Sequence, residues 1–69
     1  MEMSVARVTE ISATSTKGFE DAVREGIKRA TQTLRGVRSA CVKEQQVRVQ
    51  DGEVVEYQVN MMVTFVLDD

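Results

Sequence analysis

The chain has 69 residues, which is enough for one domain over residues 1–69. Its formal net charge of −2 and its pI near 5.0 argue against a nucleic-acid-binding surface. It contains one cysteine and no histidine, so an internal disulfide, a Cys/His zinc site and a nucleophile paired with a histidine are all excluded. Because neither disulfides nor such a zinc site can stabilise the small core, we expect the protein to self-associate, and we expect no enzymatic activity.

The first half of the chain predicts a strand followed by a helix. Residues 4–12 are rich in Val, Thr and Ile with polar interruptions, which is typical of a β-strand. The polar cluster after residue 12 predicts the end of this strand, and Ser15 is the expected N-cap of the helix. From about residue 16 to residue 35 apolar or small residues recur at spacings of three and four, which predicts one amphipathic helix. They are Phe19, Ala22, Val23, Gly26, Ile27, Ala30 and Leu34. Gly36 is expected to follow its last turn as the C′ residue.

The second half predicts a β-hairpin. Residues 37–49 read as a strand, and Asp51-Gly52 is a pair favoured in two-residue hairpin turns. In residues 54–67 every second side chain is apolar, which predicts a long strand with one fully buried face. The apolar residues are Val55, Tyr57, Val59, Met61, Val63, Phe65 and Leu67.

The element order is therefore β-α-β-β, which predicts an α+β fold. If the helix returns the chain across the sheet, the first two strands run parallel, while the hairpin makes the third strand antiparallel to the second. In an antiparallel three-stranded sheet the third strand must therefore lie between the first two. The single helix covers only one face of such a sheet. The other face carries apolar residues among polar groups, which again favours self-association; they are Val8, Val54, Met62 and Val66.

Five short motifs, taken together in this order and spacing, point to a known family. They are Thr14-Ser15-x-x-Gly18-Phe19-Glu20, Ala30-x-x-Thr33-Leu34-Arg35, Val42-Lys43-Glu44, Tyr57-Gln58-Val59 and Val63-x-Phe65-x-Leu67-Asp68. Through them the chain resembles the dodecin family over nearly its whole length. The resemblance implies a β-α-β-β subunit, a hollow homododecamer and, in many members, binding or storage of a flavin (riboflavin, FMN or FAD).

The resemblance also implies where a flavin would bind, and the sequence departs from the family there. Flavin-binding dodecins usually begin the second strand with Trp-Phe-Glu-Val, and the tryptophans of two symmetry-related subunits sandwich a stacked pair of isoalloxazine rings. The matching residues here are Ser39-Ala40-Cys41-Val42, and the chain has no tryptophan. Gln58 matches the glutamine whose amide contacts the edge of the flavin ring. It is interpreted either as a retained ligand contact or as a hydrogen-bonding residue between subunits.

Two arginines that the family associates with nucleotide or phosphate contacts are replaced by Gln46 and Val66, which puts binding of nucleotides or coenzyme A in doubt. The resemblance therefore implies a degenerate flavin site, with Ser39, Cys41, Gln46 and Gln58 as its candidate residues. The alternative is a flavin-free structural or ion-binding assembly. In that case carboxylates would meet at a symmetry axis and hold a hard cation; the candidates are Glu10, Glu20, Asp21, Asp68 and Asp69.

Three further expectations concern Cys41 and the environment of the protein. Cys41 is expected to be a small, mostly buried strand residue rather than a reactive thiol. No signal-peptide pattern opens the sequence, and no apolar run approaches the roughly 20 residues that span a bilayer. A cytoplasmic protein without a membrane partner is therefore expected.

Overall fold

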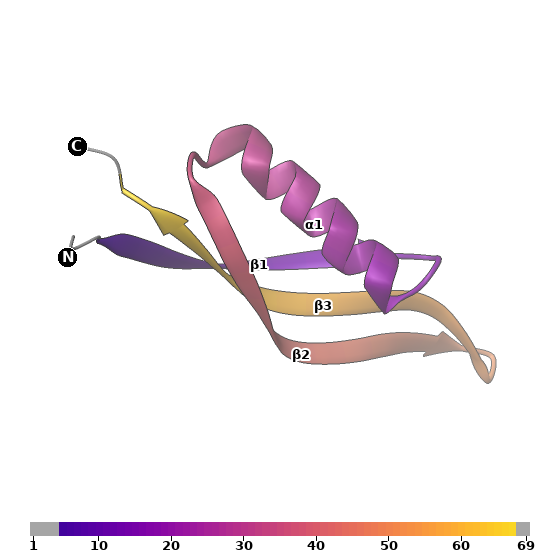
Figure 1. The fold of residues 1–69 in the computed structure, drawn as a ribbon. Coiled ribbons are helices and arrows are strands. Elements are labelled where there is room, and N and C mark those ends of the chain that lie inside the picture. The colour runs from indigo at the N-terminus through magenta and orange to yellow at the C-terminus, as the bar shows by residue number, and fades with distance from the viewer. Residues whose placement is uncertain (1–4, 68–69) are drawn as a thin grey trace.

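The structure, a computed structural model, describes residues 5–67, which form three strands and one helix in the predicted order (Figure 1). The elements are β1 (Ala6–Ser15), α1 (Phe19–Thr33), β2 (Val37–Gln50) and β3 (Glu53–Val66). The strands form one antiparallel sheet in the order β1-β3-β2. The predicted α+β fold with a central third strand is therefore confirmed. The helix of this described part is too short and too polar to cross a membrane.

The core lies between α1 and the middle of β3. Its fully buried members are Val59, Met61 and Val63 of β3 and Ala22 of α1. Gly26 allows the helix to approach the sheet closely, since a Cβ atom there would lie only 2.7 Å from Cε of Met61 and 3.0 Å from Cβ of Ala13. The predicted apolar face of the helix is confirmed, and its small residues determine how near the helix lies.

β1 continues three residues beyond its predicted end. Ala13, Thr14 and Ser15 remain in the strand because each pairs with a residue of β3. Ser15 is therefore not the N-cap of α1; that position is Gly18. The hydroxyl of Ser15 instead accepts a hydrogen bond from the backbone N–H of Lys17 (2.9 Å) and donates one to Oδ2 of Asp21 (2.7 Å). The N-cap prediction was wrong, and Ser15 fixes the connection between the strand and the helix.

The C-terminal end of the helix also differs from the prediction. Leu34 is the C-cap, and its N–H donates a hydrogen bond to the carbonyl of Ala30 (2.8 Å). Gly36, predicted as C′, lies outside this cap with φ of 70°. Its carbonyl accepts a hydrogen bond from the N–H of Val66 (3.0 Å). Gly36 therefore starts the pairing of β2 with β3 and does not terminate the helix.

The β2–β3 hairpin extends well past the helix (Figure 1), and the longest dimension of the molecule is 54 Å. Its turn is the predicted one: Asp51 and Gly52 have φ of 53° and 77°, as a type I′ turn requires. No residue from Arg38 to Gln50 is buried. The apolar face of β3 is likewise buried only at its centre, so the prediction of a fully buried face was too broad for a single chain.

Candidate functional site

The four residues that the resemblance suggested for a flavin site all lie on the sheet face opposite α1, which we call the open face; they are Ser39, Cys41, Gln46 and Gln58. It is formed by Val8, Glu10, Ser12 and Thr14 of β1, by Ser39, Cys41, Glu44 and Gln46 of β2, and by Gln58, Asn60, Met62 and Thr64 of β3. These residues are in register with one another across the three strands. Their positions on β3 alternate with those of the buried core residues, which point toward the helix.

A β-bulge brings Gln46 to the open face. The register with β3 passes over Lys43 between Val42 and Glu44, so the alternation of β2 changes phase at that point. As a result Gln46 lies directly opposite Gln58. In a regular strand Gln46 and Ser39 would be on opposite faces, and strict alternation along residues 37–49 would have separated them.

The amide of Gln58 is oriented by a chain of hydrogen bonds. Nε2 of Gln58 donates to Oδ1 of Asn60 (3.2 Å), and Nδ2 of Asn60 donates to Oε1 of Glu44 (2.9 Å). A primary amide has two N–H donors and a carbonyl acceptor, so Gln58 keeps one donor and its carbonyl for another partner. The sequence reasoning missed Asn60 and Glu44. The spacing of two from Gln58 could have indicated Asn60, whereas Glu44 reaches this face only through the bulge.

The candidate residues form two separate groups within one chain: Ser39 lies with Cys41, and Gln46 lies with Gln58. Ser39 is opposite Thr64, whereas Gln46 is opposite Gln58, six positions away along β3. At the rise of a β-strand this separation is about 20 Å. Between the two groups an ion pair joins β2 to β1, with Nζ of Lys43 3.6 Å from Oε1 of Glu10.

Cys41 differs from its prediction. It was expected to be mostly buried, but its side chain is exposed and forms no disulfide. The physical reason is that β2 is an edge strand and nothing in the single chain covers the open face. The neighbouring position on β3, Met62, is also only partly buried, while Met61 points into the core. The alternation of these two methionines is as expected for a strand with one covered face.

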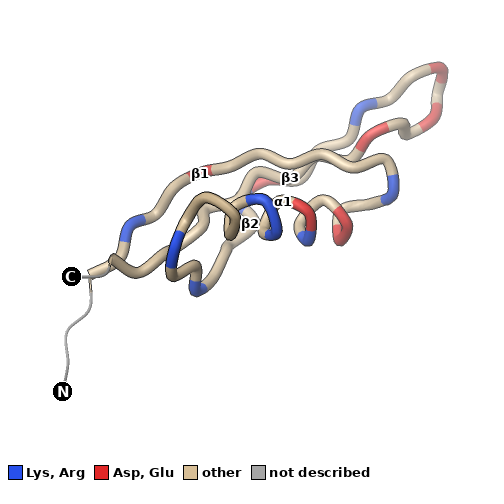
Figure 2. The backbone as a smooth tube through the Cα atoms, turned by 90° about the horizontal axis from the view of Figure 1, so that it is seen from above, with Lys and Arg blue, Asp and Glu red and all other residues tan. Residues whose placement is uncertain are grey.

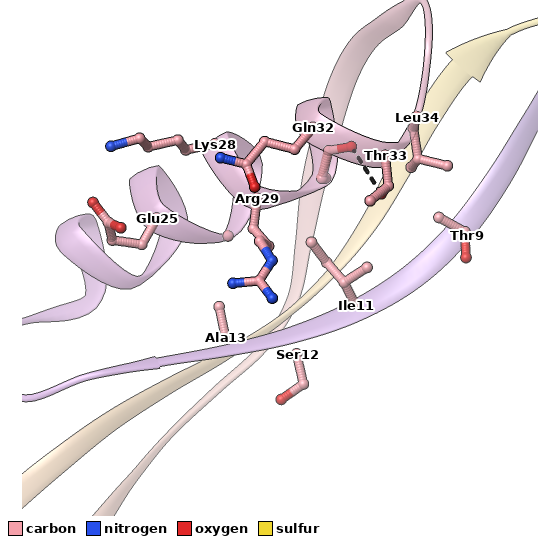
Figure 3. Close-up of a pocket in the computed structure, with 12 residues that line it drawn as sticks. Thr9, Ile11, Ser12, Ala13, Glu25, Lys28, Arg29, Gln32, Thr33 and Leu34 are labelled. Carbon is pink, nitrogen blue, oxygen red and sulfur yellow. Dashed lines mark hydrogen bonds between the residues drawn. The ribbon is translucent and has the colours of Figure 1, made fainter.

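A separate groove of about 770 Å³ lies on the helix side, between β1 and the C-terminal half of α1 (Figure 3). We call it the α1–β1 groove. Its apolar lining includes Ile11, Ala13, Ala30 and Leu34, and its charged lining consists of Glu25, Lys28 and Arg29. Figure 3 shows Arg29 reaching from the helix toward β1, while the side chains of Glu25 and Lys28 point away from the strand. None of the four candidate residues lines this groove.

Three of the five carboxylates considered as cation ligands have partners within the chain. Glu20 forms an ion pair with Arg24 (3.1 Å), Asp21 accepts the hydrogen bond from Ser15, and Glu10 pairs with Lys43. Among residues 5–67 no three His, Cys, Asp or Glu side chains come together as a metal site would require. The other two candidates, Asp68 and Asp69, lie outside the described residues.

Comparison with known proteins agrees with the fold. The family model for dodecins matches residues 5–68. The chain belongs to the dodecin family. This dodecin is similar to a solved dodecin from Streptomyces davaonensis, with 40% identity and a TM-score of 0.94 over 99% of this chain and 100% of that one.

The calcium dodecin of Mycobacterium tuberculosis is a second relative. It is 33% identical to this dodecin over 63 residues, which are 91% of this chain and 89% of the relative. A solved structure of calcium dodecin from the same species has 31% identity and a TM-score of 0.80, covering 93% of this chain and 91% of that one. That structure is described as a calcium-chelating antigen with a novel calcium-binding site.

Proposed function

We propose that this dodecin is a non-enzymatic binding protein that assembles into a homododecamer and holds a small planar molecule of the flavin class weakly on its open face. The observation that carries the proposal is the amide of Gln58. It lies on an uncovered face, is oriented by Asn60 and Glu44, and keeps donor and acceptor capacity for another partner. The edge of a flavin ring offers both acceptors and a donor to such an amide.

The assembly is part of this proposal because one chain does not unite the candidate residues. Ser39 and Gln58 are about 20 Å apart along the sheet. A ligand that contacts both positions must therefore lie between copies of the chain. The exposed apolar side chains of β2, which include Val42 and Val47, support the same conclusion, since they have no cover within one subunit.

The weakness of the site follows from the missing tryptophan. Stacking an aromatic side chain on a planar ligand contributes about 0.5–1.5 kcal/mol beyond the burial of area, and the buried area itself contributes about 25 cal/mol per Å². Ser39 provides neither. Because a site between two symmetry-related copies loses the stacking surface twice, the expected affinity for flavins is low.

The test is a titration of the purified protein with riboflavin, FMN and FAD, followed by flavin fluorescence. We expect weak or undetectable binding by the native protein. Ser39→Trp should bind at least tenfold more tightly, equivalent to about 1.4 kcal/mol, and should quench the fluorescence of the stacked ring. Ser12→Trp places the same side chain on the open face of the opposite edge strand and should produce no comparable gain. Tight binding by the native protein, or no gain with Ser39→Trp, would contradict the degenerate-site proposal.

Calcium binding is the second candidate, and the named calcium dodecin relative is the observation that favours it. In this alternative the carboxylates of several copies meet at a symmetry axis, where one carboxylate per chain becomes several oxygen ligands. Calorimetric titration of the same preparation with calcium separates the two candidates. Saturable calcium binding, together with no detectable flavin binding even by the Ser39→Trp variant, would favour the ion-binding assembly.

A further inference from the structure

The tip of the β2–β3 hairpin is acidic and apolar and has no cover in the single chain. Asp51 and Glu53 flank the turn, and Val49 and Val54 beside them expose 58% and 46% of their surface. The third acidic residue near the tip, Glu56, is 3.7 Å from Nε of Arg48 in an ion pair. Within residues 5–67 neither Asp51 nor Glu53 has an ion-pair partner. We call residues 49–54 the hairpin tip.

The α1–β1 groove has complementary chemistry. Its floor offers apolar side chains, including Ile11 and Leu34, for the valines of a partner. Two cations, Lys28 and Arg29, and one anion, Glu25, line it, so its charged rim carries a net positive charge, and Arg29 is the cation that reaches toward β1 (Figure 3). No ion pair involves Lys28 or Arg29 in the described part of the chain. Figure 2 shows basic residues along the C-terminal half of α1 and a group of acidic residues at the far end of the hairpin.

We propose that the hairpin tip of one copy binds in the α1–β1 groove of a second copy. This contact deepens the assembly proposed above and depends on it. The tip cannot reach the groove of its own chain, because the hairpin turn and the C-terminal end of α1 lie at opposite ends of the molecule (Figure 1). The valines of the tip cover the apolar floor, while Asp51 and Glu53 approach Lys28 and Arg29.

A contact of this kind joins two different patches, so it repeats from copy to copy and forms a closed ring when the rotation between copies permits. Burial of the valines supplies most of the affinity, because exposed ion pairs contribute little. The charges select the partner patch and its orientation. Reversing the charges on one side should therefore weaken the contact, and reversing both sides should restore it.

The test uses charge exchange in the full chain. The groove variant is Lys28→Glu with Arg29→Glu, and the tip variant is Asp51→Asn with Glu53→Lys. Asn is chosen at position 51 because it tolerates the left-handed backbone found there, with φ of 53°. Light scattering across a dilution series measures the concentration at which each oligomer dissociates.

We expect the groove variant and the tip variant each to dissociate at a concentration at least tenfold higher than the native protein. The combined variant, with all four substitutions, should return to within about threefold of the native value. Lys17→Glu is the matched control, since it reverses one exposed charge before the opposite end of α1, outside the groove, and should leave the dissociation concentration unchanged.

Cross-linking provides a measurement that does not depend on the folding of the charge variants. In a Cys41→Ser background, a chain with Lys28→Cys and Glu53→Cys should form covalent oligomers with a short bismaleimide. A chain with only one of the two cysteines should not form them. A folded combined variant that fails to recover its mass, or a double-cysteine chain that forms no covalent ladder, would overturn the proposed contact. If the native protein is itself a monomer, it is the underlying assembly that fails.

Discussion

Replacing Gly26 by alanine tests whether the close approach of α1 to the sheet limits the size of the side chain at this position. Gly26→Ala should raise the helix propensity of α1 by about 1 kcal/mol if packing were unaffected. The new Cβ atom, however, would lie 2.7 Å from Cε of Met61 and 3.0 Å from Cβ of Ala13. Met61 is fully buried, and its terminal methyl, at the end of a flexible side chain, must move aside, while the Cβ of Ala13 is fixed to the backbone of β1 and cannot. Overpacking of this kind costs about 1–3 kcal/mol.

The overpacking cost exceeds the propensity gain, so Gly26→Ala should destabilise the protein by about 1 kcal/mol. Chemical denaturation followed by circular dichroism measures this, with all variants at one protein concentration because the stability of an oligomer depends on concentration. Thr31→Ala is the control, since it raises the helix propensity at an exposed position of α1 without adding an atom to the core and should not destabilise the protein. In a Met61→Val background, which shortens the opposing side chain, the penalty of Gly26→Ala should shrink. If Gly26→Ala stabilised the native protein by about 1 kcal/mol, the close helix–sheet contact would be refuted.

Three further substitutions examine the packing at the C-terminal end of β3 and the ion pair on the open face. Phe65→Ala should lower the unfolding free energy by about 2–3 kcal/mol, less than for a fully buried phenylalanine, because the ring is only partly buried. Leu67→Ala, at the exposed end of the same segment, is the control and should cost under about 1 kcal/mol. Equal thermal stability of both variants would show that Phe65 does not contribute to the packing. Glu10→Gln should change the free energy of unfolding, measured by denaturant titration, by less than about 0.5 kcal/mol, because the ion pair with Lys43 is exposed. A larger loss would mean that this pair is buried between copies.

The sequence was sufficient for the element order, the topology and the helix face. The β-α-β-β order left only the central position for the third strand of an antiparallel sheet, and the alternation in residues 54–67 agreed with it. The three- and four-residue spacings in α1 placed Ala22, Gly26 and Ala30 against the sheet. These features depend on periodicity, which sequence reports directly. The type I′ turn was predictable for the same local reason, since Asp-Gly accepts two successive positive φ angles.

The features that the sequence did not predict depend on pairing between strands. Ser15 is a good N-cap residue by local preference, but pairing with Tyr57 keeps it in β1. Gly36 has the positive φ of a helix-ending glycine, but its carbonyl pairs with Val66 instead. Neither outcome is visible in a short window of sequence, because the competing partner lies at least 30 positions further along the chain.

The bulges had the largest effect on the candidate site. Nothing in residues 37–49 marks Lys43 as the extra residue, yet its insertion places Glu44 and Gln46 on the open face beside Asn60 and Gln58. The family resemblance indicated Gln46, whereas the alternation of the strand alone would have assigned it to the helix side. Register shifts of a single residue move every later side chain to the other face, so they decide which polar groups form a site.

The structure separates the two surfaces proposed for this dodecin. The residues proposed to contact a ligand, Ser39, Gln46 and Gln58, lie on the open face, whereas the hairpin tip and the α1–β1 groove contain none of them. Substitutions at one surface therefore leave the contacts of the other intact, apart from what is transmitted through the shared sheet. A chain can then lose the stacking residue at position 39 without losing the contacts that stabilise so small a core. If assembly is what keeps this dodecin folded, the assembly surfaces are under stronger physical constraint than the ligand face, and a flavin site can degenerate within an intact oligomer.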